Sequence, residues 1–155
     1  MANKKAAPAK TISNARARFD YELKDSYIAG IVLSGAETKS LRMGRGHLKG
    51  AFVNIKDGEL WLNNATVTPH ITNSAHLPSD SQTRARKLLV KKRELAQLQS
   101  AKEQGLTIVP TKLLTRGRFI KIEIATAKGK KKYDKRQSIK ERDTSRDTAR
   151  ALKNL

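Results

Sequence analysis

The sequence predicts a mainly β domain built as a small antiparallel barrel, with helices packed outside it and a basic tail at its C-terminus. The chain has 155 residues, which suits one domain with short appended arms. Apolar and polar residues alternate over several short segments, as they do in half-buried strands. Because five short strands make a poor two-layered sandwich, closure into a Greek-key barrel of the oligonucleotide-binding (OB) type is the economical arrangement.

The N-terminal part is expected to pass from a disordered arm into a long strand. Residues 1–13 are rich in Ala, Lys, Pro and Thr, so we expect no packed structure there. Apolar residues alternate from Phe19 to Leu33, and an interruption at Asp25–Ser26 indicates a bulge or a bend. The barrel domain is placed at residues 14–127.

A short helix and the clearest hairpin follow the first strand. The segment Gly35–Arg42 is a helix candidate that begins after Ser34 and ends at Gly44. Two alternating segments then flank Asp57–Gly58, a dipeptide typical of a type I′ turn.

In the second half of the domain, a helix is again followed by a hairpin. Residues 68–82 are expected to be a loop, and residues 83–104 a long helix with one apolar and one basic face. A second hairpin follows around Arg116–Gly117, and Pro110 indicates an edge position or a bulge in its first strand.

The tail, residues 128–155, carries eleven Lys or Arg and four Asp or Glu. Its apolar side chains are too few to offset the entropy of ordering, so we expect the free tail to be disordered. The aromatic Tyr133 and the acidic Asp134 lie inside a run of lysines, which an attraction between charges alone does not require. The tail is therefore predicted to fold when it binds a polyanion that has a defined structure.

The formal net charge of +19 indicates a polyanionic partner, with nucleic acid as the first candidate and an anionic membrane as the second. No apolar run is long enough to span a membrane. The N-terminus has lysines without the apolar core of a secretory signal, so a cytoplasmic protein is expected. The absence of Cys excludes disulfides and thiolate metal sites.

The sequence gives no sign of catalysis. The histidines His47, His70 and His76 lack metal-ligand spacing, and no nucleophile-elbow, phosphate-loop or dinucleotide-binding motif occurs. We therefore predict no catalytic residue, no metal and no cofactor. A generic basic RNA chaperone or ribosome-associated barrel protein, and an RNA-processing enzyme, stay open as alternative classes.

Two features of the predicted surface are open to more than one interpretation. The basic face of the 83–104 helix is either simply solvated or binds phosphates. Trp61 points away from the apolar face of its strand, so it is either packed under a helix or a platform for stacked bases. We favour packing for Trp61, since a lone Trp in a small domain is usually buried.

Three blocks, in order along the chain, carry a family resemblance. They are NARARFDY at 14–21, AGIVLSGAETKSLRMG at 29–44, and GKKKYDKR running into IKER within 129–142. Through these blocks the chain resembles the SsrA-binding proteins (small protein B) of bacterial trans-translation. The resemblance implies an OB-like barrel without enzymatic activity that binds the tRNA-like domain of transfer-messenger RNA (tmRNA) and brings it to stalled ribosomes.

The resemblance also implies a set of residues that bind tmRNA. They are Asn14, Arg16, Arg18, Glu37, Lys39, Ser40, Leu41, Arg42, Lys87 and Leu88. Glu37 is expected to accept from a base or to orient a neighbouring Lys or Arg, with a plain surface pair to Lys39 as the alternative. Arg42 is expected to contact phosphate.

A second set of residues, by the same resemblance, acts on the ribosome. The tail is expected to enter the empty mRNA channel, become helical and monitor the decoding centre, with the ring of Tyr133 stacked on a base. The residues are Lys130, Lys131, Lys132, Tyr133, Asp134, Lys135, Arg136, Ile139, Lys140 and Arg142. The expected partners are tmRNA, small-subunit ribosomal RNA and a complex containing elongation factor Tu, with the protein monomeric and away from membranes.

Overall fold

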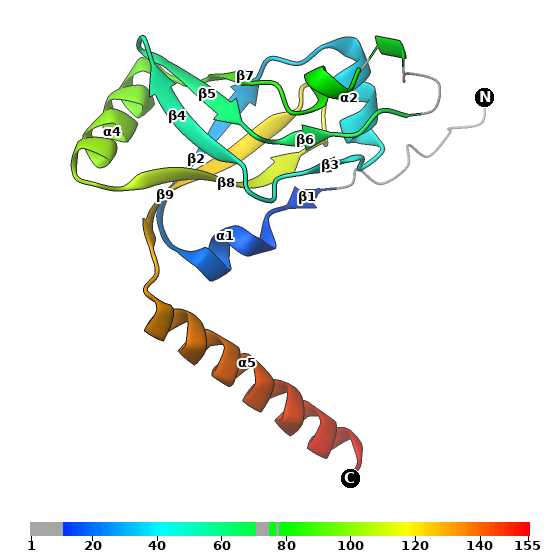
Figure 1. The fold of residues 1–155 in the computed structure, drawn as a ribbon, viewed down its shortest axis with the longest axis vertical. Coiled ribbons are helices and arrows are strands. Elements are labelled where there is room, and N and C mark those ends of the chain that lie inside the picture. The colour runs from blue at the N-terminus through cyan, green and yellow to red at the C-terminus, as the bar shows by residue number, and fades with distance from the viewer. Residues whose placement is uncertain (1–10, 71–74, 77) are drawn as a thin grey trace.

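Short β-strands form the body of the molecule, and a long C-terminal helix extends away from it (Figure 1). The computed structural model describes residues 11–70, 75–76 and 78–155. In chain order the elements are β1 (Ile12–Ser13), α1 (Ala15–Asp20), β2 (Tyr21–Ile31), α2 (Gly35–Arg42), β3 (Gly46–His47), β4 (Phe52–Lys56), β5 (Glu59–Asn63), β6 (Thr66–Val67), α3 (Ser79–Gln82), β7 (Arg86–Leu89), α4 (Lys92–Glu103), β8 (Thr107–Leu114), β9 (Lys121–Gly129) and α5 (Lys132–Lys153).

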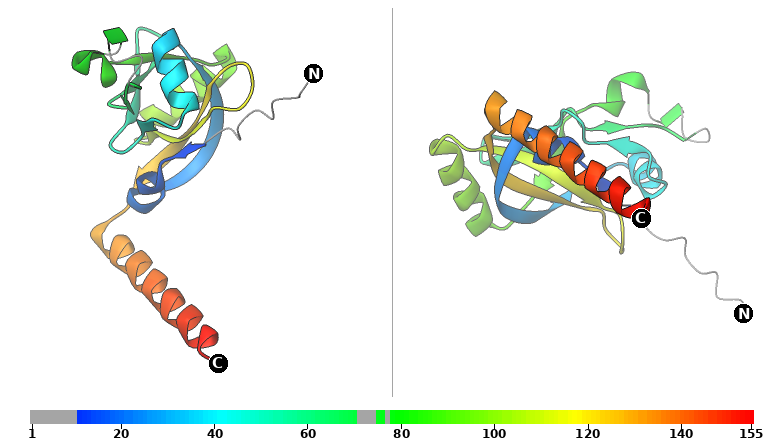
Figure 2. Two further views of the ribbon diagram at one scale, coloured as in Figure 1. Left: turned by 90° about the vertical axis from the view of Figure 1, so that its right-hand side faces the viewer. Right: turned by 90° about the horizontal axis from the view of Figure 1, so that it is seen from below.

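The main sheet curls round on itself as a ring of antiparallel pairings. Strands β8, β4, β5, β7, β2 and β9 are neighbours in that order, and β9 pairs back with β8. The β4–β8 contact rests on the single pair Val53 and Ile108, so the ring is joined most weakly there. Strand β1 extends β8, and β3 and β6 form a separate two-stranded sheet. The prediction of a mainly β, antiparallel fold with flanking helices is confirmed (Figure 2).

The inward faces of these strands form one apolar core. Leu60 of β5, Leu88 of β7 and Ile122 of β9 are each at most 3% exposed. Helices α2 and α4 cover the ends of this core with Leu41 and Leu98, which are equally buried. Each such side chain contributes about 1.5–3 kcal/mol by leaving water, so the core fixes the strands that carry the candidate site.

Local sequence signals are confirmed where they are strongest. Helix α2 has the predicted bounds, and Ser34 caps it by accepting a hydrogen bond from the backbone N–H of Glu37 at 3.3 Å. Gly44 follows it with a φ of 76°, as a helix stop requires. Asp57 and Gly58 have φ values of 52° and 72°, the left-handed pair that a type I′ turn needs.

Both predicted irregularities in the long strands are also present. The register of β2 against β9 shifts between Leu23 and Ser26, where the sequence indicated a bulge or bend. The register of β8 against β9 shifts between Pro110 and Lys112. Because β8 has β1, β4 and β9 as neighbours, Pro110 marks a bulge rather than an outer edge.

The predicted helix over 83–104 is wrong in its first half. Residues 86–89 form β7, and α4 begins only at Lys92. Leu88 lies opposite Leu60 of β5 and Ile31 of β2, so pairing on both sides overrides the helical spacing of the leucines. The continuous basic helix face expected there does not form.

The N-terminal boundary also differs from the prediction. Residues 15–20 form α1, so the first long strand begins at Tyr21 rather than Phe19. Ile12 is 9% exposed and pairs with Leu113 in β1–β8, so the arm is packed at its end. Residues 1–10 lie outside the described residues, and their disorder stays a prediction. At the other end, β9 continues to Gly129.

The tail forms α5, a helix of 22 residues none of which is buried. Its first half touches α1: Lys135 Nζ lies 3.2 Å from Asp20 Oδ1, and the Arg142 guanidinium lies 5.7 Å from the Phe19 ring centre. The disorder of the free tail stays a prediction. Among the described residues, no helix combines the length and apolar character needed to cross a membrane.

Candidate nucleic-acid interface

The carboxylate of Glu37 lies at the centre of a polar network beneath the surface. Glu37 is in the first turn of α2, and its side chain is fully buried. Its Oε2 accepts from the backbone N–H of Ser34 at 2.9 Å, which completes the capping box. Arg84 binds both carboxylate oxygens, donating from Nε at 2.9 Å and from Nη2 at 2.7 Å. Arg86 adds a third guanidinium hydrogen bond, from Nε to Oε1 at 2.9 Å.

Arg86 is a buried cation that the sequence did not single out. It points inward from β7, and its side chain is 1% exposed. Its two terminal nitrogens donate to backbone carbonyls at 2.7–3.3 Å. The carbonyls are those of Ala65, Ser81, Gln82 and Arg84. Arg86 therefore ties α2, the end of α3 and the chain between β5 and β6 to one strand.

The charges in this network stabilise each other. Burial alone raises the pKa of Glu37, but hydrogen bonds from Arg84 and the Ser34 backbone, with the charge of Arg86, outweigh it and hold the pKa below its ordinary value. Burial lowers the pKa of Arg86, and the Glu37 carboxylate opposes that shift. Of the sequence interpretations of Glu37, the structure supports the one in which it orients neighbouring arginines.

Five residues expected to bind tmRNA are buried, so their side chains offer little surface to an RNA in this conformation. They are Asn14, Glu37, Ser40, Leu41 and Leu88, none more than 8% exposed. Asn14 caps α1 by accepting from the Ala17 N–H at 3.3 Å, and it donates to the Pro110 carbonyl at 2.9 Å. Leu41 and Leu88 belong to the core. These side chains hold the surface in shape rather than form it.

Arg42 is exposed, but its guanidinium is already engaged. Nη1 donates to the carbonyls of Thr115 at 3.4 Å and Gly117 at 3.0 Å, and Nη2 to that of Arg118 at 2.8 Å. All three acceptors lie in the turn between β8 and β9. In this structure the guanidinium clamps that turn, and its contact with phosphate stays a prediction.

The remaining cations predicted to bind tmRNA are exposed or half-buried. Arg16 forms an ion pair with Asp20 at 3.2 Å, within α1. Arg18 and Lys39 are exposed on α1 and α2. Lys87 points outward from β7 and pairs with Glu59 of β5. Since Arg84 and Lys87 both bind carboxylates, the more available cations of this region are Lys91 and Lys92, which are exposed.

Two large apolar side chains are exposed together on the outer face of the sheet. Ile28 of β2 is 56% exposed and Leu89 of β7 is 54% exposed. Gly30 pairs with both Leu89 and Lys121, so it brings β7 and β9 to the same place. Ile28, Leu89, Lys91 and Lys121 line one open depression there, which we call the Ile28–Leu89 patch. Glu94 also lines the depression. Apolar side chains with lysines beside them are suited to RNA, since they pack on bases and sugars while the cations bind phosphates.

This patch was not predicted, because residues 83–104 have the spacing of a helix whereas residues 86–89 form a strand. In a helix, neighbouring leucines share one apolar stripe, whereas in a strand they point to opposite sides. Leu88 is accordingly buried, and Leu89 is on the surface. The alternating strand around Ile28 was visible in the sequence, but its partner across the sheet was not.

Trp61 lies outside the buried core, contrary to the interpretation we favoured. It is half-buried on the outer face of β5, in register with Asn54 of β4 and Lys87 of β7. It belongs neither to the buried core nor to the apolar side chains packed against it.

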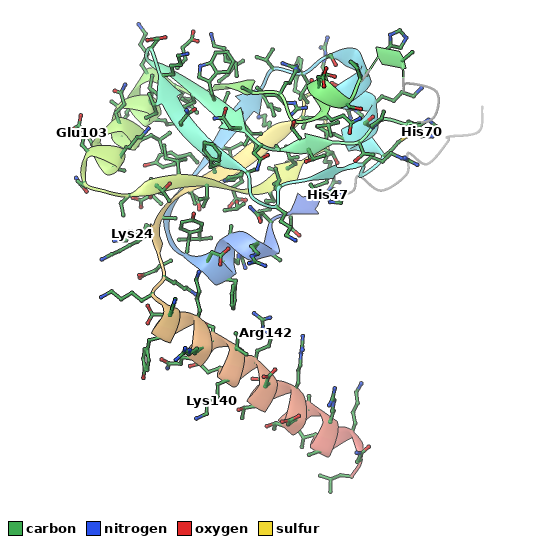
Figure 3. The ribbon with its side chains drawn as sticks, in the orientation of Figure 1. Lys24, His47, His70, Glu103, Lys140 and Arg142 are labelled. Carbon is green, nitrogen blue, oxygen red and sulfur yellow. The ribbon has the colours of Figure 1, made fainter. Side chains whose placement is uncertain are left out.

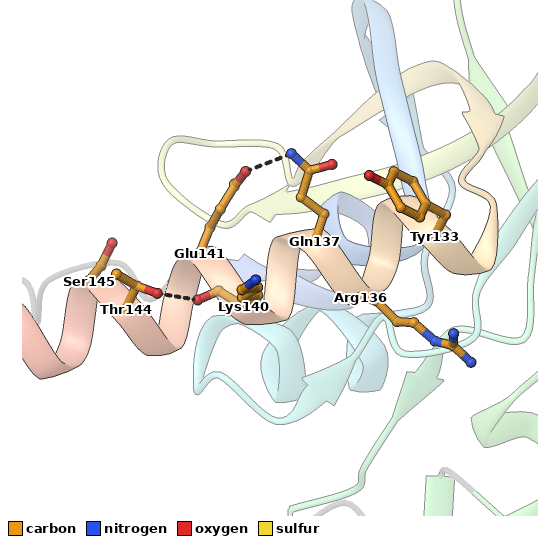
Figure 4. Close-up of a pocket in the computed structure, with 7 residues that line it drawn as sticks. All are labelled: Tyr133, Arg136, Gln137, Lys140, Glu141, Thr144 and Ser145. Atoms are coloured by element: carbon orange, nitrogen blue, oxygen red, sulfur yellow. Dashed lines mark hydrogen bonds between the residues drawn. The ribbon is translucent and has the colours of Figure 1, made fainter.

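Helix α5 presents two different faces. Lys135 and Arg142 point back towards α1, and Figure 3 shows Arg142 on the barrel side of the helix with Lys140 on the other. Figure 4 shows the outer face, where Tyr133 and Lys140 stand beside Gln137, which donates to Glu141 at 3.1 Å. Tyr133 is 75% exposed. The tail residues expected to act on the ribosome are thus divided between an engaged and a free face.

Ile139 is 45% exposed on α5, and the three lysines that precede Tyr133 lie at its start. Lys130 is already tied to the body, because its backbone N–H donates to the Asp20 carbonyl at 2.9 Å and its Nζ to that of Arg18 at 3.1 Å. Asp134 Oδ2 accepts from the Lys131 N–H at 3.3 Å and so caps α5. Over the residues that the structure describes, no cluster of three or more His, Asp or Glu is placed to hold a metal ion.

The comparisons with known proteins agree with this architecture. The sequence matches the family model described as SmpB protein over residues 11–154, nearly the whole chain. The chain belongs to the SmpB family. SmpB relatives include the SsrA-binding protein of Pseudomonas putida (strain GB-1), 47% identical over 156 residues that cover 99% of this chain and 97% of the relative. The SsrA-binding protein of Synechococcus sp. (strain JA-2-3B'a(2-13)) is 48% identical over 92% of both chains.

A solved SmpB structure is also similar. It is described as "tmRNA-SmpB: a journey to the center of the bacterial ribosome" and is 42% identical, with a TM-score of 0.63. The match covers 79% of this chain and 85% of that one. The resemblance carried by the three sequence blocks is therefore confirmed at the level of the SmpB family and its fold.

Proposed function

We propose that the chain is an RNA-binding adaptor of trans-translation. The barrel binds the tRNA-like domain of tmRNA, and α5 carries the ribosome-sensing residues into an mRNA channel that holds no mRNA. The observation that carries the proposal is the separation of two RNA-suited surfaces, the Ile28–Leu89 patch on the sheet and the outer face of α5. Relatives named SsrA-binding proteins and a solved tmRNA–SmpB complex support it.

The two surfaces suit different tasks. The patch lies on a sheet whose strands are fixed by the core, so it offers a preformed site for a folded RNA. Helix α5 has no buried residue, so it is free to leave α1 when a better partner appears. The ordered barrel thus binds tmRNA, and the basic helix α5 senses the ribosome.

We expect the protein to meet its partners on the ribosome. The expected ribosomal contacts of the tail are small-subunit RNA at the decoding centre and along the mRNA channel, and elongation factor Tu is expected in the delivered complex. The protein acts in the cytoplasm, where ribosomes are, as a monomer and without a reaction or cofactor of its own. A generic RNA chaperone would share the charge but would not prefer a tRNA-like RNA.

Replacing Leu89 by Ser is expected to weaken binding of the tRNA-like RNA about tenfold, the loss expected when one apolar contact of about 1.5 kcal/mol disappears. Because Leu89 is exposed, the midpoint of urea unfolding should barely move. Phe52→Ser is the matched control, since Phe52 is a 46% exposed apolar residue on β4, away from the patch. Unchanged affinity in both Leu89→Ser and Ile28→Ser would mean that the RNA binds another surface of the protein.

Replacing Lys121 by Ala is expected to change the salt dependence of binding rather than its sequence preference. An exposed lysine on a phosphate releases about one counterion, so the slope of log K against log salt should become shallower by about 0.7–0.9. The measurement is a salt titration of binding with both proteins. Lys56→Ala, at the hairpin turn, is the control and should leave the slope as it is. A wild-type affinity that does not depend on salt would contradict electrostatic binding altogether.

A further inference from the structure

The turn between β8 and β9 is exposed, basic and aromatic. Figure 2 (left) shows it as the yellow loop that projects beside α2. From Thr115 to Ile120 the sequence is TRGRFI, with two arginines and no acid. The ring of Phe119 is 70% exposed, and the guanidinium of Arg118 lies 5.5 Å from its centre. A phenyl ring held in water adds little to folding, and this one is open to contact by a partner.

The turn is held in place from outside by Arg42. The three hydrogen bonds from its guanidinium reach the carbonyls of Thr115, Gly117 and Arg118 at 2.8–3.4 Å. Gly117 has a φ of 93°, which lets the chain reverse at that point. A loop fixed by three such bonds loses little further entropy when a ligand binds, so its aromatic ring is preorganised.

The turn continues the Ile28–Leu89 patch. Phe119 and Lys121 are both exposed, and Ile120 between them is 5% exposed, so the two outer side chains follow one another on the same side of the chain. Lys121 is already part of the patch through its pairing with Gly30, which also pairs with Leu89. An RNA seated on the patch therefore has the turn at its edge.

We propose that Phe119 stacks on an unpaired base of the tRNA-like RNA, with Arg116 and Arg118 on the adjoining phosphates and Arg42 as the residue that positions the turn. The site rests on the proposed function, since the same RNA occupies the patch. A base has a π-face of the size of the phenyl ring, and the arginines supply the cations that its backbone requires. The absence of acids in the turn removes the charge that would repel that backbone.

The test compares ring chemistry at one position. Phe119→Leu keeps an apolar side chain but removes the π-face, and we expect about a tenfold loss of affinity for the isolated tRNA-like RNA. Phe119→Trp keeps a stacking face and should bind within about twofold of the wild type. Phe52→Leu is the control for loss of an exposed ring elsewhere and should have no effect. Equal affinities for Phe119→Leu and wild type would overturn the proposal.

The positioning role of Arg42 has its own readout. If Arg42 acts through the turn, Phe119→Leu should cost much less in an Arg42→Ala background than in the wild type, because the ring is no longer held in place. Additive losses would mean that Arg42 does not present Phe119. The thermal midpoint of each variant separates this coupling from a loss of fold.

Two further outcomes separate the inference from the function on which it rests. If wild-type protein did not bind the tRNA-like RNA, the proposed function would fail, whatever the state of Phe119. If Phe119→Leu kept full affinity for that RNA but lost peptide tagging on stalled ribosomes, the ring would face ribosomal RNA instead, and the present assignment would be wrong.

Discussion

A chain that ends at Gly129 is expected to bind the tRNA-like RNA almost as well as the full chain and to support no tagging on stalled ribosomes. Residues 130–155 carry ten Lys or Arg and four Asp or Glu, yet none of the residues of α5 is buried. The helix extends away from the barrel (Figure 1), and charges are screened over about 8 Å at physiological salt. We therefore expect affinity within about threefold of the wild type and complete loss of tagging.

The body should tolerate this truncation. The contacts removed are exposed ones, such as Lys135 with Asp20 and Arg142 over Phe19. Surface pairs of this kind contribute less than about 1 kcal/mol each. Thermal unfolding of the shortened chain should accordingly stay close to that of the full protein, so a tagging defect reports on the tail itself.

A shuffled tail separates charge from arrangement. A variant with the same residues from 130 to 155 in a different order keeps the net charge but moves Tyr133 and its neighbours off the outer face of α5. We expect it to fail in tagging, and Tyr133→Ala to fail in the same way with RNA binding intact. Full tagging by the shuffled tail would show that charge is sufficient. Loss of RNA binding on truncation would make the tail a general clamp.

The two faces of α5 explain why loss of the tail should abolish tagging. A helix of 22 residues is about 33 Å long, enough to reach well beyond the barrel. Tyr133 and Lys140 are free on its outer face, whereas Lys135 and Arg142 must leave α1 before they meet another partner. The contacts to α1 are weak enough to exchange, so they can set the direction of the helix without holding it there.

Elements with local signals could be predicted from the sequence. The capping box at Ser34 and the Asp57–Gly58 turn are each decided by a few neighbouring residues, and both are present in the structure. The family resemblance likewise rested on contiguous blocks. These features depend little on what packs against them.

Elements decided by distant partners could not be predicted in this way. Residues 86–89 have helical spacing, but pairing with β2 and β5 makes them a strand. The burial of Arg86 and the exposure of Leu89 both follow from that one strand. The candidate site was therefore only partly visible from the sequence: a basic face was expected within residues 83–104, but Lys121 was not singled out, and the apolar centre depended on an assignment that tertiary contacts reversed.

Replacing Glu37 by Gln is expected to destabilise the fold by about 3–5 kcal/mol, because the buried Arg86 then has no counter-charge. The thermal midpoint should fall by about 10 °C for a chain of this size. Glu59→Gln is the matched control, since it removes a carboxylate from the half-exposed pair with Lys87 and should cost less than about 1 kcal/mol. Similar losses of unfolding free energy in the two variants would mean that the buried ion pairs stabilise the fold no more than the exposed one.

The same substitution should change how stability depends on acid. The folded-state pKa of Glu37 lies below its unfolded value of about 4.3, so the contribution of its charge is fully present above that pH and is lost as the pH falls through the folded-state pKa. Wild-type protein should lose stability across this acid range, and Glu37→Gln should lose less, since its side chain does not titrate. Urea unfolding at a series of pH values measures both. Parallel pH profiles would assign the acid sensitivity to other carboxylates, and the network beneath α2 would then stabilise the fold by shape and hydrogen bonding rather than by charge.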